Sequence, residues 1–117
     1  MREQHAFSAD LSALLAHIHT LGFNVSLGEA ARTAFQQAQY RATGASKVRV
    51  SQHQLRLAID LYIWRELTRI PIEDLRPIGL WWESRSPANR WGGSWRGQLR
   101  TGPGAFIDND HFERALK

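Results

Sequence analysis

The sequence of 117 residues contains no cysteine. This absence excludes disulfide bonds and thiolate metal ligands, so any metal has to be held by His, Asp or Glu. No segment approaches the length of an apolar membrane span, and we expect no membrane partner. The composition, 43% hydrophobic and 22% charged, is that of an ordinary globular protein. We therefore predict a single domain over residues 1–117.

The N-terminal segment lacks the apolar block and the small-residue cleavage site of a secretory signal peptide. It begins Met1-Arg2-Glu3-Gln4-His5 and continues as an amphipathic stretch. We therefore expect the protein to be made in the cytoplasm and to stay there until another factor releases it.

Acidic residues are in the minority, and the formal net charge is +4. Nearly all of the 15 basic residues are arginines, which are spread from Arg2 to Arg114. Such a surface favours anionic partners, either nucleic acid or the acidic polymers of a bacterial cell wall. The arginines form no cluster or stripe and no nucleic-acid-binding motif appears, so we do not expect nucleic acid as a partner.

Apolar residues at helical spacing predict a helix over residues 9–21, capped by Ser8 or Asp10 and ended by Gly22. His17 and His19 are two apart on this helix and do not share a face, so they are surface or boundary residues and not a metal site. A short extended piece over residues 23–27 and a helix in the second half of residues 29–42 follow.

The next segment has the periodicity of a strand. Four apolar residues alternate with four others, in the order Leu57, Ala58, Ile59, Asp60, Leu61, Tyr62, Ile63 and Trp64. A carboxylate in such a strand would be costly to bury without a partner, so we expect a cation beside Asp60.

The C-terminal half completes an α+β domain, a small antiparallel sheet flanked by helices. A helix is predicted over residues 71–86, although Pro77 can shift its start. Residues 87–103 are rich in Gly, Arg and Trp and predict loops and short strands, in which Trp91 and Trp95 serve either the core or a substrate wall. A turn at residues 108–110 should then lead into a last strand or short helix.

Two histidines and a carboxylate have the right chemistry for a zinc site: His53, Asp60 and His111. A catalytic zinc site keeps a fourth position for water, and Asp108 lies within a turn of His111. Positions 53 and 60 would face opposite ways on one strand, so His53 has to lie in a loop. Asp108 and His111 can share a side only if a turn or helical segment separates them. Glu113 can orient an imidazole by hydrogen bonding.

The sequence resembles the zinc peptidases that cleave bacterial cell-wall peptides, which group D-alanyl-D-alanine carboxypeptidases and dipeptidases with bacteriophage L-alanyl-D-glutamate endopeptidases. The resemblance covers most of the chain from Glu29 onward. It rests on Glu29-x-x-Arg32-Thr33, Gln36-Gln37, Tyr40, Gly44-x-Ser46-Lys47, Ser51-x-His53-x6-Asp60, Trp91-Gly92-Gly93 and Asp108-x-x-His111-Phe112-Glu113. Arg56 stands where many members carry glycine, and Asp108 replaces a common glutamate; both features are similar to the phage endolysin branch.

The resemblance implies a hedgehog/D-Ala-D-Ala-peptidase-like fold with Zn²⁺ held by His53, Asp60 and His111. It further implies that Asp108 is the general acid and base and that Arg32 holds the scissile carbonyl and its developing oxyanion. Ser51 would support the His53 loop or line the pocket.

The function implied by the resemblance is endolysin cleavage of the L-Ala–D-Glu bond in peptidoglycan stem peptides, by a monomer that reaches the wall after release by a holin or by lysis. Two alternatives stay open. One is a D-Ala-D-Ala carboxypeptidase or dipeptidase on the same scaffold, and the other is a catalytically silent zinc-binding virion or structural protein.

Overall fold

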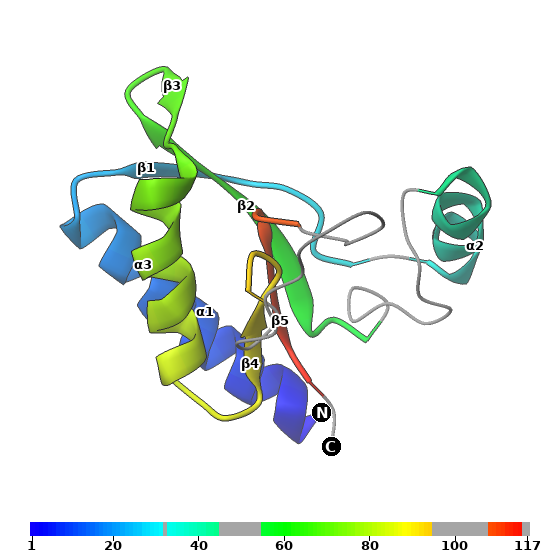
Figure 1. Ribbon diagram of the computed structural model, residues 1–117. Helices are drawn as coiled ribbons and strands as arrows, with labels where there is room; N and C mark the ends of the chain where they lie inside the picture. Colours follow the sequence, from blue (N-terminus) through cyan, green and yellow to red (C-terminus); the bar gives the residue numbers. More distant parts are fainter. Residues whose placement is uncertain (32, 45–54, 95–107, 116–117) are drawn as a thin grey trace.

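The computed structural model describes residues 1–31, 33–44, 55–94 and 108–115. These residues form three helices and five strands, and the predicted α+β class is confirmed (Figure 1). Within the described residues, no helix combines the length and apolar character needed to cross a membrane. The elements in chain order are α1 (Arg2–Thr20), β1 (Asn24–Leu27), α2 (Ala34–Thr43), β2 (Ala58–Arg65), β3 (Thr68–Arg69), α3 (Ile72–Ser84), β4 (Asn89–Trp91) and β5 (His111–Arg114).

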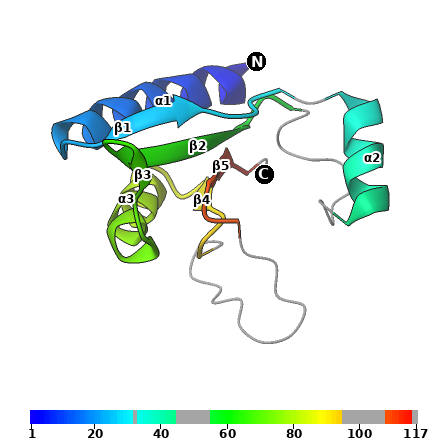
Figure 2. The ribbon, with the colours of Figure 1, turned by 90° about the horizontal axis from the view of Figure 1, so that it is seen from above.

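The five strands make one antiparallel sheet in the order β1-β2-β5-β4, and β3 pairs with β2 in a tight hairpin. The long strand β2 is the centre of this sheet. In its pairing with β5, Asp60 lies directly opposite His111. Helices α1 and α3 lie close to the sheet, and α2 stands apart from the other elements (Figures 1 and 2).

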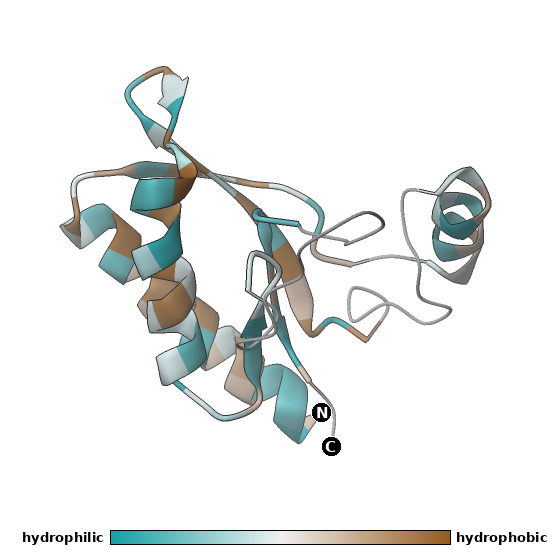
Figure 3. Ribbon diagram, viewed as in Figure 1, coloured by the Kyte–Doolittle hydropathy of each residue, from teal (hydrophilic) through white to brown (hydrophobic). Residues whose placement is uncertain are grey.

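Side chains along β2 point alternately to two faces of the sheet. The core face carries Ile59, Leu61 and Ile63, and the site face carries Asp60, Tyr62 and Trp64. Ile59, Leu61 and Ile63 are buried and pack with the apolar residues of α1 and α3. Figure 3 shows hydrophobic residues in the middle of β2 and along α3, whereas α2 carries mostly hydrophilic residues. The aromatic part of the core is joined by edge-to-face contacts of Trp82 with Phe7 and Phe112, at centroid distances of 5.7 and 6.2 Å.

Helix α1 begins seven residues earlier than residues 9–21 predict, at Arg2. Phe7 extends the buried stripe of the helix by two turns, and this first part is held by distant residues. The Gln4 amide donates to the Leu55 carbonyl at 2.9 Å, and the Arg114 Nε donates to the Glu3 carboxylate at 2.6 Å. Asp10 is therefore not a cap; its carboxylate accepts a hydrogen bond from the Asn89 amide at 3.2 Å.

The other predicted helices lie close to their expected positions. Helix α2 starts at a capping box, in which Thr33 and Gln36 each accept a hydrogen bond from the backbone of the other. Helix α3 continues through Pro77, so this proline does not set its start. His17 stacks on Trp81 with ring centroids 4.1 Å apart, and His19 is exposed, so the two histidines lie at boundary and surface positions, as predicted.

Candidate metal centre

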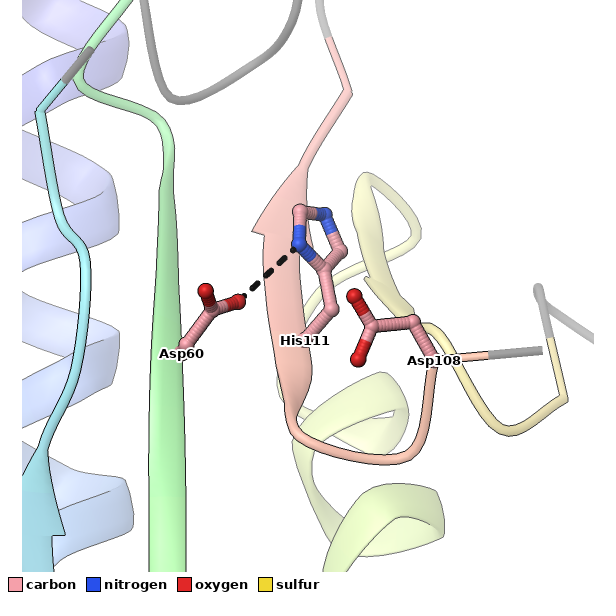
Figure 4. A group of neighbouring side chains, drawn as sticks. All are labelled: Asp60, Asp108 and His111. Atoms are coloured by element: carbon pink, nitrogen blue, oxygen red, sulfur yellow. Dashed lines mark ion pairs between the residues drawn. The ribbon is translucent and has the colours of Figure 1, made fainter. Parts of the chain in front are cut away.

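Asp60 and His111 meet across the central strand pair. Because they are register partners in the antiparallel pairing of β2 with β5, their side chains project from the same face of the sheet. The His111 Nδ1 atom lies 3.5 Å from the Asp60 Oδ1 atom (Figure 4). The His111 imidazole is therefore a group beside Asp60 that carries a positive charge when it is protonated.

A turn brings Asp108 to the same place, as its spacing from His111 requires. The backbone N–H of His111 donates to the Asp108 carbonyl at 3.1 Å and closes the turn. The turn is held by hydrogen bonds to the end of β4 and to the residue that follows it. The N–H of Asp108 donates to the Gly92 carbonyl at 3.1 Å, and the Trp91 indole donates to the Asn109 carbonyl at 2.8 Å. A Cβ atom on Gly92 would lie 2.0 Å from the Asp108 carbonyl oxygen, so only glycine fits there.

Asp60, Asp108 and His111 form a possible metal-binding cluster. One ligand atom from each residue lies within 4.8 Å of the other two, and Figure 4 shows the side chains converging from β2, the turn and β5. Two carboxylates and an imidazole supply the oxygen and nitrogen donors that Zn²⁺ accepts. The donor set present therefore fits the metal that the sequence predicts.

His111 is oriented by a second carboxylate on its own strand. Residues 111 and 113 share a strand face, and the His111 Nε2 atom lies 2.6 Å from the Glu113 Oε1 atom. Glu113 in turn pairs with Arg90 of the neighbouring strand β4. This chain of contacts fixes the imidazole ring and leaves Nδ1 facing Asp60, as in many metal sites in which a carboxylate orients the ligating histidine. The predicted orienting contact of Glu113 is confirmed.

Burial and neighbouring charges perturb the titration of the cluster. Burial alone would lower the pKa of His111, but the hydrogen bonds with Asp60 and Glu113 outweigh it and raise the pKa to about 9. Burial raises the pKa of Asp108. The charge of His111 lowers this pKa and the negative charge of Asp60 raises it, and the net shift is upward. Burial opposes the ionisation of Glu113, yet the contacts with His111 and Arg90 lower its pKa. Asp108 is thus a half-buried carboxyl group with a raised pKa, which is common for groups that transfer protons.

Two predicted site residues, His53 and Arg32, lie outside the described residues, as do Ser51 and Trp95. The neighbours of Arg32 in the sequence are held close to the cluster. The N–H of Asp60 donates to the Glu29 carbonyl at 2.9 Å, and the Tyr40 hydroxyl donates to the Glu29 carboxylate at 3.0 Å. The resemblance residues Glu29 and Tyr40 therefore connect β2 to α2. Trp91 is fully buried and belongs to the core.

The sequence analysis did not identify Tyr62, Arg69, Arg90 and Asp110 as neighbours of the site. Tyr62 shares the face of Asp60, and this could have been inferred from the strand alternation. Arg69 and Arg90 reach the site through strand pairing, for which the sequence carries no local signal. Asp110 lies in the predicted turn directly before His111, so its position could also have been inferred.

Neither a protein-family model nor a curated protein sequence matches this chain. The structure is similar to the crystal structure of the L-Ala D-Glu endopeptidase ChiX of Serratia marcescens, with a TM-score of 0.58 and 19% sequence identity. This chain shares its fold with that endopeptidase. The match covers 78% of this chain and 66% of the endopeptidase chain. The resemblance found in the sequence is therefore confirmed at the level of the fold.

Proposed function

We propose that this chain is a zinc-dependent peptidase that cleaves the L-Ala–D-Glu bond of peptidoglycan stem peptides. The observation that carries the proposal is the convergence of Asp60, Asp108 and His111 within 4.8 Å, on the fold of an L-Ala D-Glu endopeptidase. These are three of the residues to which the sequence assigns the chemistry, and they come from separate parts of the chain.

In this proposal Asp60, His111 and His53 hold the metal. When bound, Zn²⁺ would polarise the scissile carbonyl and make a water molecule more acidic. Asp108 takes a proton from the attacking water and passes it to the amine that leaves. The raised pKa of Asp108 supports this role, because a carboxyl group that stays protonated at higher pH can act as an acid as well as a base. The Glu113 carboxylate keeps the His111 ring in place through both steps.

Arg32 is proposed to hold the developing oxyanion with its guanidinium group. Support for this role comes from the sequence resemblance and from the anchoring of Glu29 beside Asp60. The biological role we propose is that of a phage or prophage endolysin, a monomer made in the cytoplasm that acts on the wall after release by a holin or by lysis.

Digestion of purified peptidoglycan tests the proposal. We expect the zinc-loaded protein to release fragments with a new N-terminal D-Glu, and we expect a chelator to abolish their release until zinc is restored. Mass spectrometry of the new termini separates the proposal from its alternatives. Release of terminal D-Ala would identify a carboxypeptidase or dipeptidase, and zinc binding without any new terminus would indicate a structural protein.

A further inference from the structure

We propose that Arg69 and Tyr62 form a carboxylate-binding subsite beside the metal cluster. The subsite would take the free carboxylate of the glutamate residue on the leaving-amine side of the scissile bond. This proposal rests on the proposed function and adds the group that selects the substrate.

The Arg69 guanidinium is held in place by contacts from β2 and from the turn before β5. It lies over the rings of Tyr62 and Trp64 on β2, at 4.8 and 5.5 Å from the ring centroids. Its Nη2 atom donates to the Asp110 carboxylate at 2.5 Å, next to His111 in the chain. The Trp64 indole is itself fixed by a hydrogen bond to the Ser26 hydroxyl at 2.9 Å. Yet 44% of the Arg69 side chain is exposed, so the cation is both ordered and accessible.

Tyr62 contributes a hydroxyl group beside the cluster. It follows Asp60 by two residues in β2 and therefore lies on the same face of the sheet. Both residues border Gly28: a Cβ atom at that position would lie 3.0 Å from the Tyr62 hydroxyl and 3.0 Å from the Asp60 Cβ atom. The phenol is thus directed along the strand toward Asp60. Tyr62 thus lies beside Asp60 of the cluster and beneath the Arg69 guanidinium on the same face of the sheet.

The chemistry of these two groups suits a carboxylate attached to the substrate. A glutamate residue in a peptide uses one of its two carboxyl groups in the chain and keeps the other as an anion. Arg carries five N–H donors in a planar fork that matches a carboxylate, and Asp110 engages one of its two terminal nitrogens. Because Asp60, Asp108 and Asp110 would repel an anion, a fixed cation is needed where the substrate carboxylate enters.

The test compares two stem peptides that differ in one group, a free carboxylate or the corresponding amide on the D-Glu residue. The measured quantity is the ratio of kcat/KM for the acid to kcat/KM for the amide. We expect the zinc-loaded protein to prefer the acid. Arg69→Met keeps an apolar stem over the rings and removes the charge, and it should lower this ratio by roughly 10- to 100-fold, the usual range for a hydrogen-bonded charge. Tyr62→Phe should lower the ratio by a smaller factor.

Asp110→Asn is the matched control, because it removes the contact between Arg69 and the turn but leaves the guanidinium charge. The subsite requires that this variant keeps the preference for the acid. If Arg69→Met slows both peptides equally and Asp110→Asn does the same, Arg69 only supports the turn and the proposal is overturned.

A binding measurement distinguishes failure of the proposed subsite from failure of the proposed peptidase function. Calorimetric titration of the zinc-loaded full chain with a product-type peptide that begins with D-Glu, and with its amide, needs no turnover. Tighter binding of the acid that disappears in Arg69→Met supports the subsite even if neither stem peptide is cleaved. Cleavage with equal binding of acid and amide would reject the subsite and leave the proposed function in place.

Discussion

The two faces of β2 are built from one alternating sequence but have opposite physical character. The core face consists of apolar side chains that are almost completely buried, Ile59, Leu61 and Ile63. The site face consists of half-buried polar and aromatic side chains, Asp60, Tyr62 and Trp64. Burial of apolar surface stabilises the first face without precise partners. The second face places carboxylates close together, and it depends on specific groups from β3, β5 and the turn before β5.

This difference predicts that stability and function can be damaged separately. Substitutions on the core face should lower the free energy of unfolding and leave the chemistry intact. Substitutions on the site face should do the reverse, because like charges held together contribute function at some cost in stability.

The largest effect is expected on the core face, for Leu61→Ala. Leu61 is 0% exposed, and truncation of such a residue destabilises a protein by about 2–5 kcal/mol through lost burial and the cavity left behind. Urea unfolding measures the change. Zinc content should stay at the wild-type level in the folded fraction. Leu67→Ala at the 94% exposed tip of the β2–β3 hairpin is the matched control and should unfold like wild type. Equal losses in both variants would contradict the assignment of faces.

On the site face, Asp108→Asn should reduce hydrolysis by roughly 100-fold or more if Asp108 is the general acid and base. The amide is nearly isosteric, so the turn, the zinc content and the unfolding midpoint should stay close to wild type. Asp74→Asn, which removes an exposed carboxylate on α3, serves as the control. Near wild-type turnover would show that Asp108 only stabilises the turn, and loss of zinc would show that Asp108 is a metal ligand.

The cluster also predicts how the metal-free protein responds to pH. The folded pKa of His111 is raised to about 9 from 6.5, so its stabilising contribution is complete below pH 6.5 and is lost as the pH rises through 9. The unfolding equilibrium should shift by at most about tenfold per pH unit, the limit for one proton. Because metal binding displaces this proton, zinc affinity should rise over the same interval. Glu113→Gln, which removes an anionic partner of His111, should flatten the slope. A metal-free protein equally stable at both ends of the interval would contradict the charged state of His111.

The smallest effect concerns Arg56, which adopts the left-handed conformation with φ of 59°. A side chain is unfavourable there by about 1 kcal/mol, whereas glycine adopts this conformation without that cost. Arg56→Gly should therefore raise stability by a few tenths to about 1 kcal/mol, measured by thermal unfolding, without altering zinc content. A destabilised glycine variant would show that the arginine side chain makes a compensating contact.

The sequence predicted those parts of the fold that are specified locally. The alternation of apolar side chains predicted β2, and the acidic first turn and apolar residues predicted α3. Both predictions lie close to the observed bounds of these elements. The first turns of α1 were missed because their stabilising contacts, such as that of Glu3 with Arg114, are with the far end of the chain.

At the site, residue types identified Asp60, Asp108 and His111, but no local pattern gives the register that places Asp60 opposite His111. Arg69 was missed for the same reason, since β3 has only two residues and shows no period. The assignments of His53 and Arg32 stay predictions.

The pairing of β2 with β5 has a consequence for the order of folding. Asp60 and His111 come from distant parts of the sequence, and contacts of this kind form after local ones because a long loop has to close first. The helices and the β2–β3 hairpin can form while the acidic cluster does not yet exist. Zinc would then bind only after β5 has docked, and it would stabilise the finished sheet by mass action without guiding its early assembly.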